Sequence, residues 1–151
     1  MNIYLLRHGT RNFTLGDVPL NEEGLEQAED LAKRGTWADL HSILSSPKKR
    51  AKMTIEPTAE RHGHPIQVLE ELDQMRGGEG EAEFKARVKN LIHRIESGEF
   101  GEKVMVCTHS DWLAMAVQVI PTDALDLEYK MFQCAEVLEF KLEQGLWKLK
   151  D

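Results

Sequence analysis

The sequence predicts an α/β fold in which helices cover both faces of a mostly parallel central sheet, in three α/β/α layers. Short apolar runs typical of buried strands alternate along the chain with segments whose apolar residues recur at helical spacing. The last segment differs, because polar and apolar residues alternate through 136–143 and a turn follows at Gln144-Gly145. That pattern predicts an antiparallel hairpin at one edge of the sheet. The 151 residues suffice for one domain, 1–151, with a sizeable core.

The expected elements follow one another in a regular order. Four strands precede the hairpin, over residues 3–6, 41–47 with a closing turn, 66–69 and 104–108. Helices are expected from an Asn21 N-cap to Gly35, over 48–62, over 81–97, and from about 112 to Pro121. Pro57 lies inside the second of these helices and predicts a kink or a break there. Residues 70–80 are polar and glycine-rich, which predicts a mobile loop.

The composition excludes several classes of function. A net charge of -7 argues against nonspecific binding to nucleic acid or to an anionic membrane, so an anion site must be a local cationic pocket. No apolar run is long enough to span a bilayer, and Arg7 interrupts the N-terminal run that would otherwise resemble a signal peptide. Cys107 and Cys134 lack metal-ligand spacing and are expected to be reduced, although a disulfide between them stays open. We therefore expect a cytoplasmic protein with no membrane or nucleic-acid partner.

The triplet Arg7-His8-Gly9 stands at the end of the first apolar run, where ligands bind in open α/β sheets. A guanidinium offers a rigid fork of donors that suits phosphate, and an imidazole can act as a nucleophile near neutral pH. Gly9 has no side chain to block the approach of a ligand to the backbone. Taken alone, the triplet fits surface residues at a strand end equally well.

Three more polar groups follow predicted strands. Arg50 lies near the start of a helix, Glu71 belongs to the acidic stretch 69–73, and His109 with Ser110 follows the most apolar strand. The carboxyl ends of parallel strands meet at one edge of a sheet, so we expect one pocket to gather these groups.

Such a set suits phosphoryl transfer through a histidine. A neutral imidazole attacks phosphorus in line, fixed cations hold the equatorial oxygens, and a carboxylic acid protonates the leaving oxygen before activating water. We expect His8 to be the nucleophile and Arg7, Arg50 and a charged His109 to supply the cations. Glu71 is the expected acid.

Five segments occur in a particular order across nearly the whole chain. They are Leu6-Arg7-His8-Gly9-Thr10, Asp17 to Gly24, Ser45-Ser46-Pro47 with Arg50-Ala51 and Thr54, Leu69-Glu70-Glu71-Leu72, and Val106-Cys107-Thr108-His109. Together they resemble the histidine phosphatase superfamily, the phosphoglycerate mutase-like proteins. The resemblance implies a central sheet flanked by helices, a phosphohistidine on His8, and Glu71 as acid and base. It also implies that hydrolysis needs no metal and no organic cofactor.

The chain departs from the family pattern after Gly9. Thr10 stands where many members carry an acidic residue, and the loop before Asp17 is short. We expect Asn12 or Thr14 to replace a phosphate contact that this loop usually supplies. Gly9, Thr10 and Ser110 are the other expected substrate-binding positions.

The expected function is hydrolysis of a phosphomonoester or phosphoramidate of a small metabolite. Alternatives are a phosphohistidine protein phosphatase, a phosphoglycerate mutase, and a non-enzymatic phosphoryl-binding regulatory module. A small, open site favours a phosphatase over a mutase, which must retain a bisphosphorylated intermediate. Glu70 and Asp73 remain alternatives to Glu71 as the acid. His62 and His64 lack a third ligand at a sensible spacing, so no metal site is expected, and the oligomeric state is open.

Overall fold

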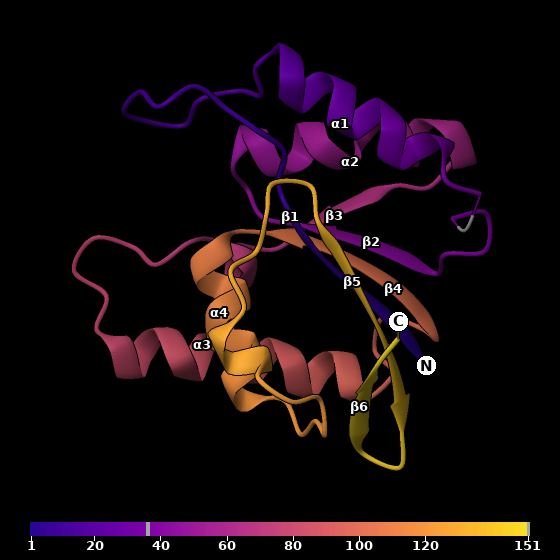
Figure 1. Ribbon diagram of the computed structural model, residues 1–151, viewed down its shortest axis with the longest axis vertical. Helices are drawn as coiled ribbons and strands as arrows, with labels where there is room; N and C mark the ends of the chain where they lie inside the picture. The colour runs from indigo at the N-terminus through magenta and orange to yellow at the C-terminus, as the bar shows by residue number, and fades with distance from the viewer. Residues whose placement is uncertain (36, 151) are drawn as a thin grey trace.

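The computed structural model describes residues 1–35 and 37–150 and contains one six-stranded sheet in the order β3-β2-β4-β1-β5-β6 (Figure 1). The strands are β1 (Asn2–Arg7), β2 (Ser42–Ser45), β3 (Ile66–Val68), β4 (Lys103–Thr108), β5 (Val137–Glu143) and β6 (Leu146–Leu149). Strands β1 to β4 pair in parallel, whereas β5 is antiparallel to β1 and forms a hairpin with β6. The predicted mostly parallel sheet with an antiparallel edge hairpin is confirmed.

Helices cover both faces of this sheet. They are α1 (Glu22–Lys33), α2 (Lys49–His62), α3 (Glu81–Glu96) and α4 (Ser110–Val119), with short 3-10 turns η1 (Glu70–Leu72) and η2 (Leu127–Tyr129). Helices α1 and α2 pack together on one face, and α3 and α4 lie on the other (Figure 1). The three layers expected from the alternating pattern are therefore present. No helix in the described residues is long and apolar enough to cross a membrane.

Strand β1 lies in the middle of the sheet and is buried on both faces. Tyr4 and Leu6 pack in the core under α1 and α2, while Ile3 and Leu5 pack in the core under α3 and α4. Each such side chain contributes about 1.5–3 kcal/mol when it leaves water. The backbone that leads into Arg7 is thus held from both sides.

For each of the helices α1 and α2, the sequence makes a local prediction about one residue. Asn21 caps α1 as predicted, because its side chain accepts the Gly24 N–H at 2.9 Å. Pro57, however, lies inside α2 without ending the helix. Its missing N–H and crowded ring cost about 3 kcal/mol in a helix interior, and the burial of Ile55 and Ala59 on either side offsets that cost.

The segment 70–80 is irregular, as expected, but it is tied to α3. Arg87 donates from its guanidinium to the main-chain carbonyls of Glu71, Asp73 and Gln74, at 2.7–3.1 Å. It also forms an ion pair of 2.8 Å with Glu79. This anchoring holds the segment at the carboxyl end of the sheet.

Candidate active site

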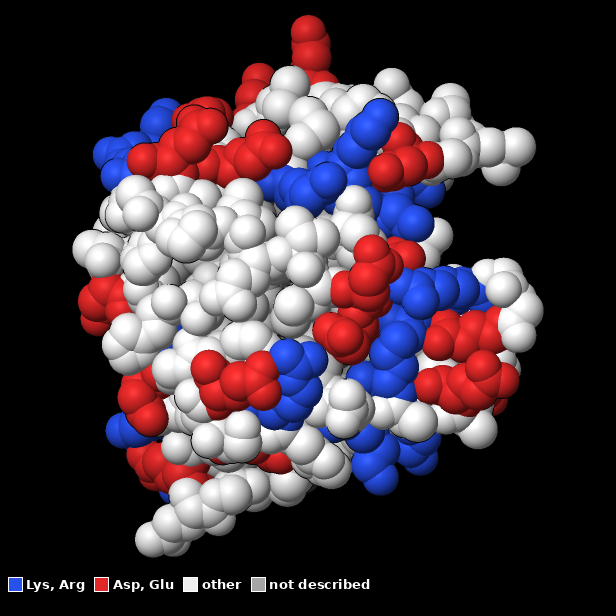
Figure 2. Space-filling model, turned by 180° about the vertical axis from the view of Figure 1, so that it is seen from behind, with Lys and Arg blue, Asp and Glu red and all other residues white. Residues whose placement is uncertain are grey.

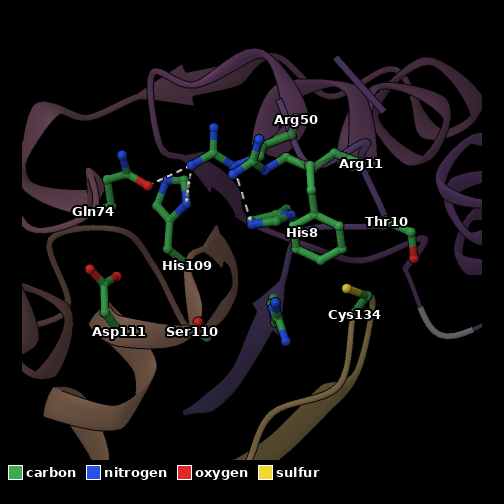
Figure 3. A pocket seen from close by; sticks show the side chains of 11 residues that line it. His8, Thr10, Arg11, Arg50, Gln74, His109, Ser110, Asp111 and Cys134 are labelled. Atoms are coloured by element: carbon green, nitrogen blue, oxygen red, sulfur yellow. Dashed lines mark hydrogen bonds between the residues drawn. The ribbon is translucent and has the colours of Figure 1, made fainter. Parts of the chain in front are cut away.

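A cavity of about 250 Å³ opens at the carboxyl ends of the parallel strands (Figure 3). Its lining comes from the ends of β1 and β4, the first turn of α2, the segment after η1, and the return into β5. The lining residues are Arg7, His8, Thr10, Arg11, Phe13, Arg50, Gln74, His109, Ser110, Asp111 and Cys134. The structure therefore brings together the expected Arg7, His8, Arg50 and His109.

The surface around this cavity is locally basic. Figure 2 shows Lys and Arg side chains gathered beside a notch at the edge where the loop after β1 and the loop before α3 project. In the lining, Arg7, Arg11 and Arg50 accompany the single carboxylate of Asp111 among the residues that the structure describes. A cationic pocket in an acidic chain suits an anionic ligand.

His8 presents one ring nitrogen to the pocket. Its Nδ1 lies 2.8 Å from the Gly9 carbonyl oxygen, which can only accept, so Nδ1 carries the proton. Its Nε2 accepts from Nε of Arg50 at 3.3 Å, as a lone pair must. Burial lowers the pKa of His8 from 6.5 to about 4, and the charge of Arg50 lowers it as well, while the bond to Gly9 opposes the shift. The imidazole is therefore neutral at neutral pH.

Main-chain hydrogen bonds hold the backbone of His8 in place. Its N–H donates to the Thr108 carbonyl at 3.0 Å, and its carbonyl accepts from the Ala135 N–H at 3.1 Å. The next N–H, of Gly9, donates to the Thr54 hydroxyl at 2.9 Å. Neighbours from β4, α2 and the approach to β5 thus fix the position of the ring.

Gly9, whose role in ligand approach stays a prediction, packs closely against α1. A Cβ at this position would lie 3.1 Å from Oε1 of Gln27 and 3.2 Å from the Gly24 carbonyl oxygen. The facing Gly24 is tighter still, since a Cβ there would lie 2.2 Å from the Thr10 carbonyl oxygen. The two glycines let the loop after β1 lie directly on α1.

Arg50 connects the polar groups of the pocket. It lies in the first turn of α2, is 3% exposed, and donates from a terminal nitrogen to Oε1 of Gln74 at 2.6 Å. The same nitrogen lies 3.4 Å from Nδ1 of His109 (Figure 3). Burial lowers the pKa of Arg50, and the charge of Arg11 adds to that effect, yet a guanidinium stays charged at neutral pH.

The contacts and burial of His109 favour a neutral imidazole in this pocket, and a charged His109 beside a bound phosphate stays a prediction. Arg50 can only donate, so Nδ1 of His109 must offer a lone pair to it. The other ring nitrogen, Nε2, lies 2.7 Å from the Ser46 hydroxyl and carries the proton. Burial lowers the pKa of His109 to about 2, and the charges of Arg50 and His8 act in the same direction. A bound phosphate would have to bring a proton to Nδ1 before His109 could donate to it.

Arg7 and Ser110 line the cavity from the carboxyl ends of the neighbouring parallel strands β1 and β4. One terminal nitrogen of Arg7 donates to the Phe132 carbonyl at 2.6 Å, which orients the guanidinium. Its Nε is buried and has no acceptor among the described residues. Ser110 begins α4, whose N-terminal N–H groups form a favourable environment for an anion.

Glu71 does not face this cavity. Its carboxylate pairs with Arg94 of α3 at 3.5 Å, and its carbonyl accepts from Trp112 at 2.7 Å. The two alternatives are also engaged elsewhere: Glu70 pairs with Arg76, and Asp73 is buried between Lys48 and Arg76. In and directly after the 3-10 turn η1, these carboxylates point away from the cavity. The side chain from this segment that lines the cavity is Gln74.

Asn12 and Thr14 are exposed and do not line the cavity either. Arg11 forms an isolated bridge with Leu20 at the start of this loop. Arg11 and Phe13 line the cavity in place of Asn12 and Thr14. Thr10 does line it, as expected, and Asp111 and Cys134 are additional lining residues that sequence reasoning missed.

The described residues contain no group of His, Cys, Asp and Glu that could hold a metal ion. Both cysteines are free thiols. Cys107 is fully buried, and burial raises the pKa of its thiol far above the usual range. It therefore behaves as a small core residue, whereas Cys134 borders the cavity.

Comparison with known families gives an independent result. A family model described as the histidine phosphatase superfamily (branch 1) matches residues 3–81. This span carries the first strands of the sheet with His8, Arg50 and Gln74.

Individual relatives extend the likeness to the whole chain. The adenosylcobalamin/alpha-ribazole phosphatase of Salmonella typhimurium is 22% identical over 191 residues, covering 100% of this chain and 90% of that protein. The structure of the alpha-ribazole phosphatase from Shigella flexneri superimposes with a TM-score of 0.83 at 19% identity, covering 99% of this chain and 95% of that one. The protein histidine phosphatase SixA, solved with tungstate, superimposes with a TM-score of 0.78 at 19% identity, covering 99% and 94%. These structural matches show a shared fold.

Proposed function

Because the chain belongs to branch 1 of the histidine phosphatase superfamily, we propose that it hydrolyses phosphorylated substrates by passing the phosphoryl group through Nε2 of His8. The family and the phosphatase class that the sequence motifs implied are confirmed. The main support for this mechanism is the contact between Nδ1 of His8 and the Gly9 carbonyl, which selects the tautomer of the ring. Its Nδ1–H is fixed on the Gly9 carbonyl, so the lone pair of Nε2 is aimed into the cationic cavity.

The first half-reaction moves the phosphoryl group to the enzyme. Nε2 of His8 attacks phosphorus, a new N–P bond forms, and the bond to the leaving group breaks on the opposite side with its electron pair. The ring carries the resulting positive charge, which the Gly9 carbonyl stabilises through Nδ1–H. Low basicity of His8 keeps the nucleophile free of a proton at neutral pH.

Fixed donors stabilise the charge on the transferring group. Arg7 and Arg50 line the cavity as cations, and Ser110 lies there at the start of α4. His109 becomes a further donor to the phosphoryl group when its Nδ1 takes up a proton. That proton arrives when the phosphate dianion binds. Arg50 must then turn its Nε donor from His8 to a phosphoryl oxygen, which releases the lone pair for attack.

The second half-reaction returns the phosphoryl group to water. A water oxygen attacks phosphorus, the N–P bond breaks, and the electron pair returns to Nε2. The protons of the water leave with inorganic phosphate and solvent. The same donors serve both half-reactions because both pass through a similar arrangement of equatorial oxygens.

A trapping experiment tests this proposal. The protein is incubated with a ³²P-labelled activated donor, quenched, and assayed for acid-labile, base-stable label on the protein. We expect label on the wild type and on the control His93→Asn, whose histidine is exposed on α3, and none on His8→Asn. Turnover with undiminished label on His8→Asn would refute the mechanism, and absence of label and of turnover from every protein would favour a binding module.

The physiological substrate is sought with a panel of phosphorylated compounds. Two proteins that this chain resembles are named as alpha-ribazole phosphatases, so alpha-ribazole phosphate belongs in the panel beside other small phosphomonoesters and phosphoramidates. Phosphoglycerate with and without a bisphosphate primer tests the mutase alternative, in which turnover would depend on the primer. We expect phosphate release without any primer.

A further inference from the structure

Among the described residues that line the cavity, no carboxylic acid is free to protonate a leaving group. Gln74 occupies the position beside Arg50 and His109, and its Oε1 accepts from Arg50 at 2.6 Å (Figure 3). A side-chain amide cannot transfer a proton to a departing oxygen. The three main-chain bonds from Arg87 hold the segment that carries Gln74, so this placement is built into the fold.

Asp111 is the one carboxylate in the described lining, and its oxygens are already engaged. Oδ1 accepts the Trp112 N–H at 2.7 Å, and Oδ2 accepts the Met75 N–H at 2.9 Å. The residue lies in the first turn of α4, where the helix dipole favours a negative charge. These contacts suit an ionised group that ties the 70–80 segment to α4.

The chemistry of the leaving group decides what such a cavity can hydrolyse. An alkyl phosphate must release an alkoxide unless an acid donates a proton in the transition state, a contribution of about 10²–10⁴-fold. An N-phosphorylated imidazole that is protonated on its other nitrogen needs no such help. When Nε2 of His8 forms its bond to phosphorus, the P–N bond breaks, the electron pair stays on the leaving nitrogen, and a neutral imidazole departs.

We propose that Gln74 makes this protein selective for phosphoramidates over unactivated phosphate esters. This inference rests on the proposed function, because it concerns the group that leaves when His8 is phosphorylated. Of the two expected substrate chemistries, phosphomonoesters and phosphoramidates, it selects the phosphoramidates. The same P–N chemistry occurs in free phosphohistidine and in phosphohistidine within a peptide, and both sources are compared in the test.

The test compares kcat/KM for phosphohistidine, glycerol phosphate and an activated aryl phosphate in five proteins. They are the wild type, Gln74→Glu, Gln74→Ala, Asp111→Asn and the control Gln118→Glu, whose glutamine is exposed on α4 outside the cavity. We expect wild type to prefer phosphohistidine to glycerol phosphate by about 10²-fold or more. Gln74→Glu is expected to raise kcat/KM for glycerol phosphate by at least about tenfold, most strongly at acidic pH where the new carboxyl is protonated.

The other variants distinguish a role of Gln74 in selectivity from the alternatives, including Asp111 as the acid. Gln74→Ala and Gln118→Glu are expected to give no gain on glycerol phosphate. A wild-type protein that hydrolyses both chemistries equally, or a Gln74→Glu variant without any gain, would overturn the selectivity. A selective loss of glycerol phosphate turnover in Asp111→Asn would also overturn it, by identifying Asp111 as the acid.

The phosphoenzyme on His8 distinguishes failure of this inference from failure of the mechanism. Labelled His8 with equal turnover of esters and phosphoramidates contradicts the role of Gln74 alone. Turnover of phosphohistidine without label on His8 contradicts the underlying mechanism. A ratio of kcat/KM between the free and the peptide-borne phosphohistidine then identifies which source the cavity accommodates better.

Discussion

Nε of Arg50 lies 3.3 Å from Nε2 of His8, so the central cation of the pocket donates to the atom that must form the new bond. The contact orients the imidazole and occupies its lone pair while no phosphate is bound. A phosphoryl oxygen is a better acceptor for a guanidinium than a neutral nitrogen is. In the proposed mechanism, substrate binding therefore frees Nε2 of His8 by drawing the Arg50 donor to a phosphoryl oxygen.

Arg50→Lys tests this relationship. Lysine keeps the charge, but a single ammonium cannot replace the separate donors that reach His8 and Gln74. We expect kcat/KM to fall by about 10²-fold or more on every substrate. Arg61→Lys, on the exposed surface of the same helix, is the control and should retain full activity. Near-normal turnover in Arg50→Lys would mean that charge alone suffices.

Thr54→Val is expected to destabilise the protein. The buried Thr54 hydroxyl accepts the Gly9 N–H at 2.9 Å and donates to the Arg50 carbonyl at 2.6 Å, so valine leaves a buried donor without an acceptor. The loss should be about 1–3 kcal/mol in urea unfolding, and Thr54→Ser should recover much of it. Thr58→Val is a matched control, because the buried hydroxyl of Thr58 has no partner among the described residues. That change should be neutral or stabilising.

Acid is expected to destabilise the fold through its two buried histidines. The pKa of His8 falls from 6.5 to about 4 and that of His109 to about 2, both mainly because of burial. Below pH 6.5 the unfolded chain binds more protons than the folded one, so stability falls as the pH drops from 6.5 to 4. His8 alone accounts for about 3 kcal/mol across that interval. Urea midpoints at several pH values should show a shallower dependence in His109→Asn than in the wild type.

Glu71→Gln is expected to leave catalysis almost unchanged. The Glu71 carboxylate pairs with Arg94 and does not line the cavity. Values of kcat/KM for glycerol phosphate and for an activated aryl phosphate should both stay within about twofold of wild type, since an exposed ion pair contributes little. A large loss confined to the poorer leaving group would restore Glu71 as the acid.

Arg87→Ala should loosen the segment that carries Gln74. The change removes donors to the carbonyls of Glu71, Asp73 and Gln74, and it removes the partner that holds the pKa of Glu79 at about 2. We expect a loss of about 1–3 kcal/mol in urea unfolding, together with faster amide exchange over residues 70–80. Arg94→Ala, whose ion pairs lie at the surface, is the control and should cost less than about 1 kcal/mol.

The sequence predicted the positions of site residues best where those residues directly follow regular strands or begin a helix. The order of apolar runs and helical segments predicted the sheet, and parallel strands whose carboxyl ends coincide brought His8, Arg50 and His109 into one cavity. These positions depend on backbone pairing that a sequence pattern reports directly. The proposed nucleophile His8 and the two side chains beside it are therefore located without knowledge of the loops.

Loops limited the prediction because their side-chain directions depend on local turns. Because of the 3-10 turn η1, the side chain of Gln74 lines the cavity and that of Glu71 does not. A turn of three residues is too short to produce a periodic pattern in the sequence. In the loop after β1, Arg11 and Phe13 line the cavity whereas Asn12 and Thr14 do not, and no regular pattern in the sequence reports that difference. The protonation of His109 depended on burial and on the nearby Arg50, neither of which a sequence displays.

The place of β1 in the sheet has a consequence for synthesis. This strand precedes both of its neighbours, β4 and β5, which come much later in the chain (Figure 1). On the ribosome, the apolar run from Ile3 to Leu6 must wait for partners while most of the protein emerges, and such late pairing is slow and prone to aggregation. His8 also lacks its bond from Ala135 until then. In the proposed mechanism, His8 therefore gains its full set of backbone contacts only after the segment that carries Ala135 has been made.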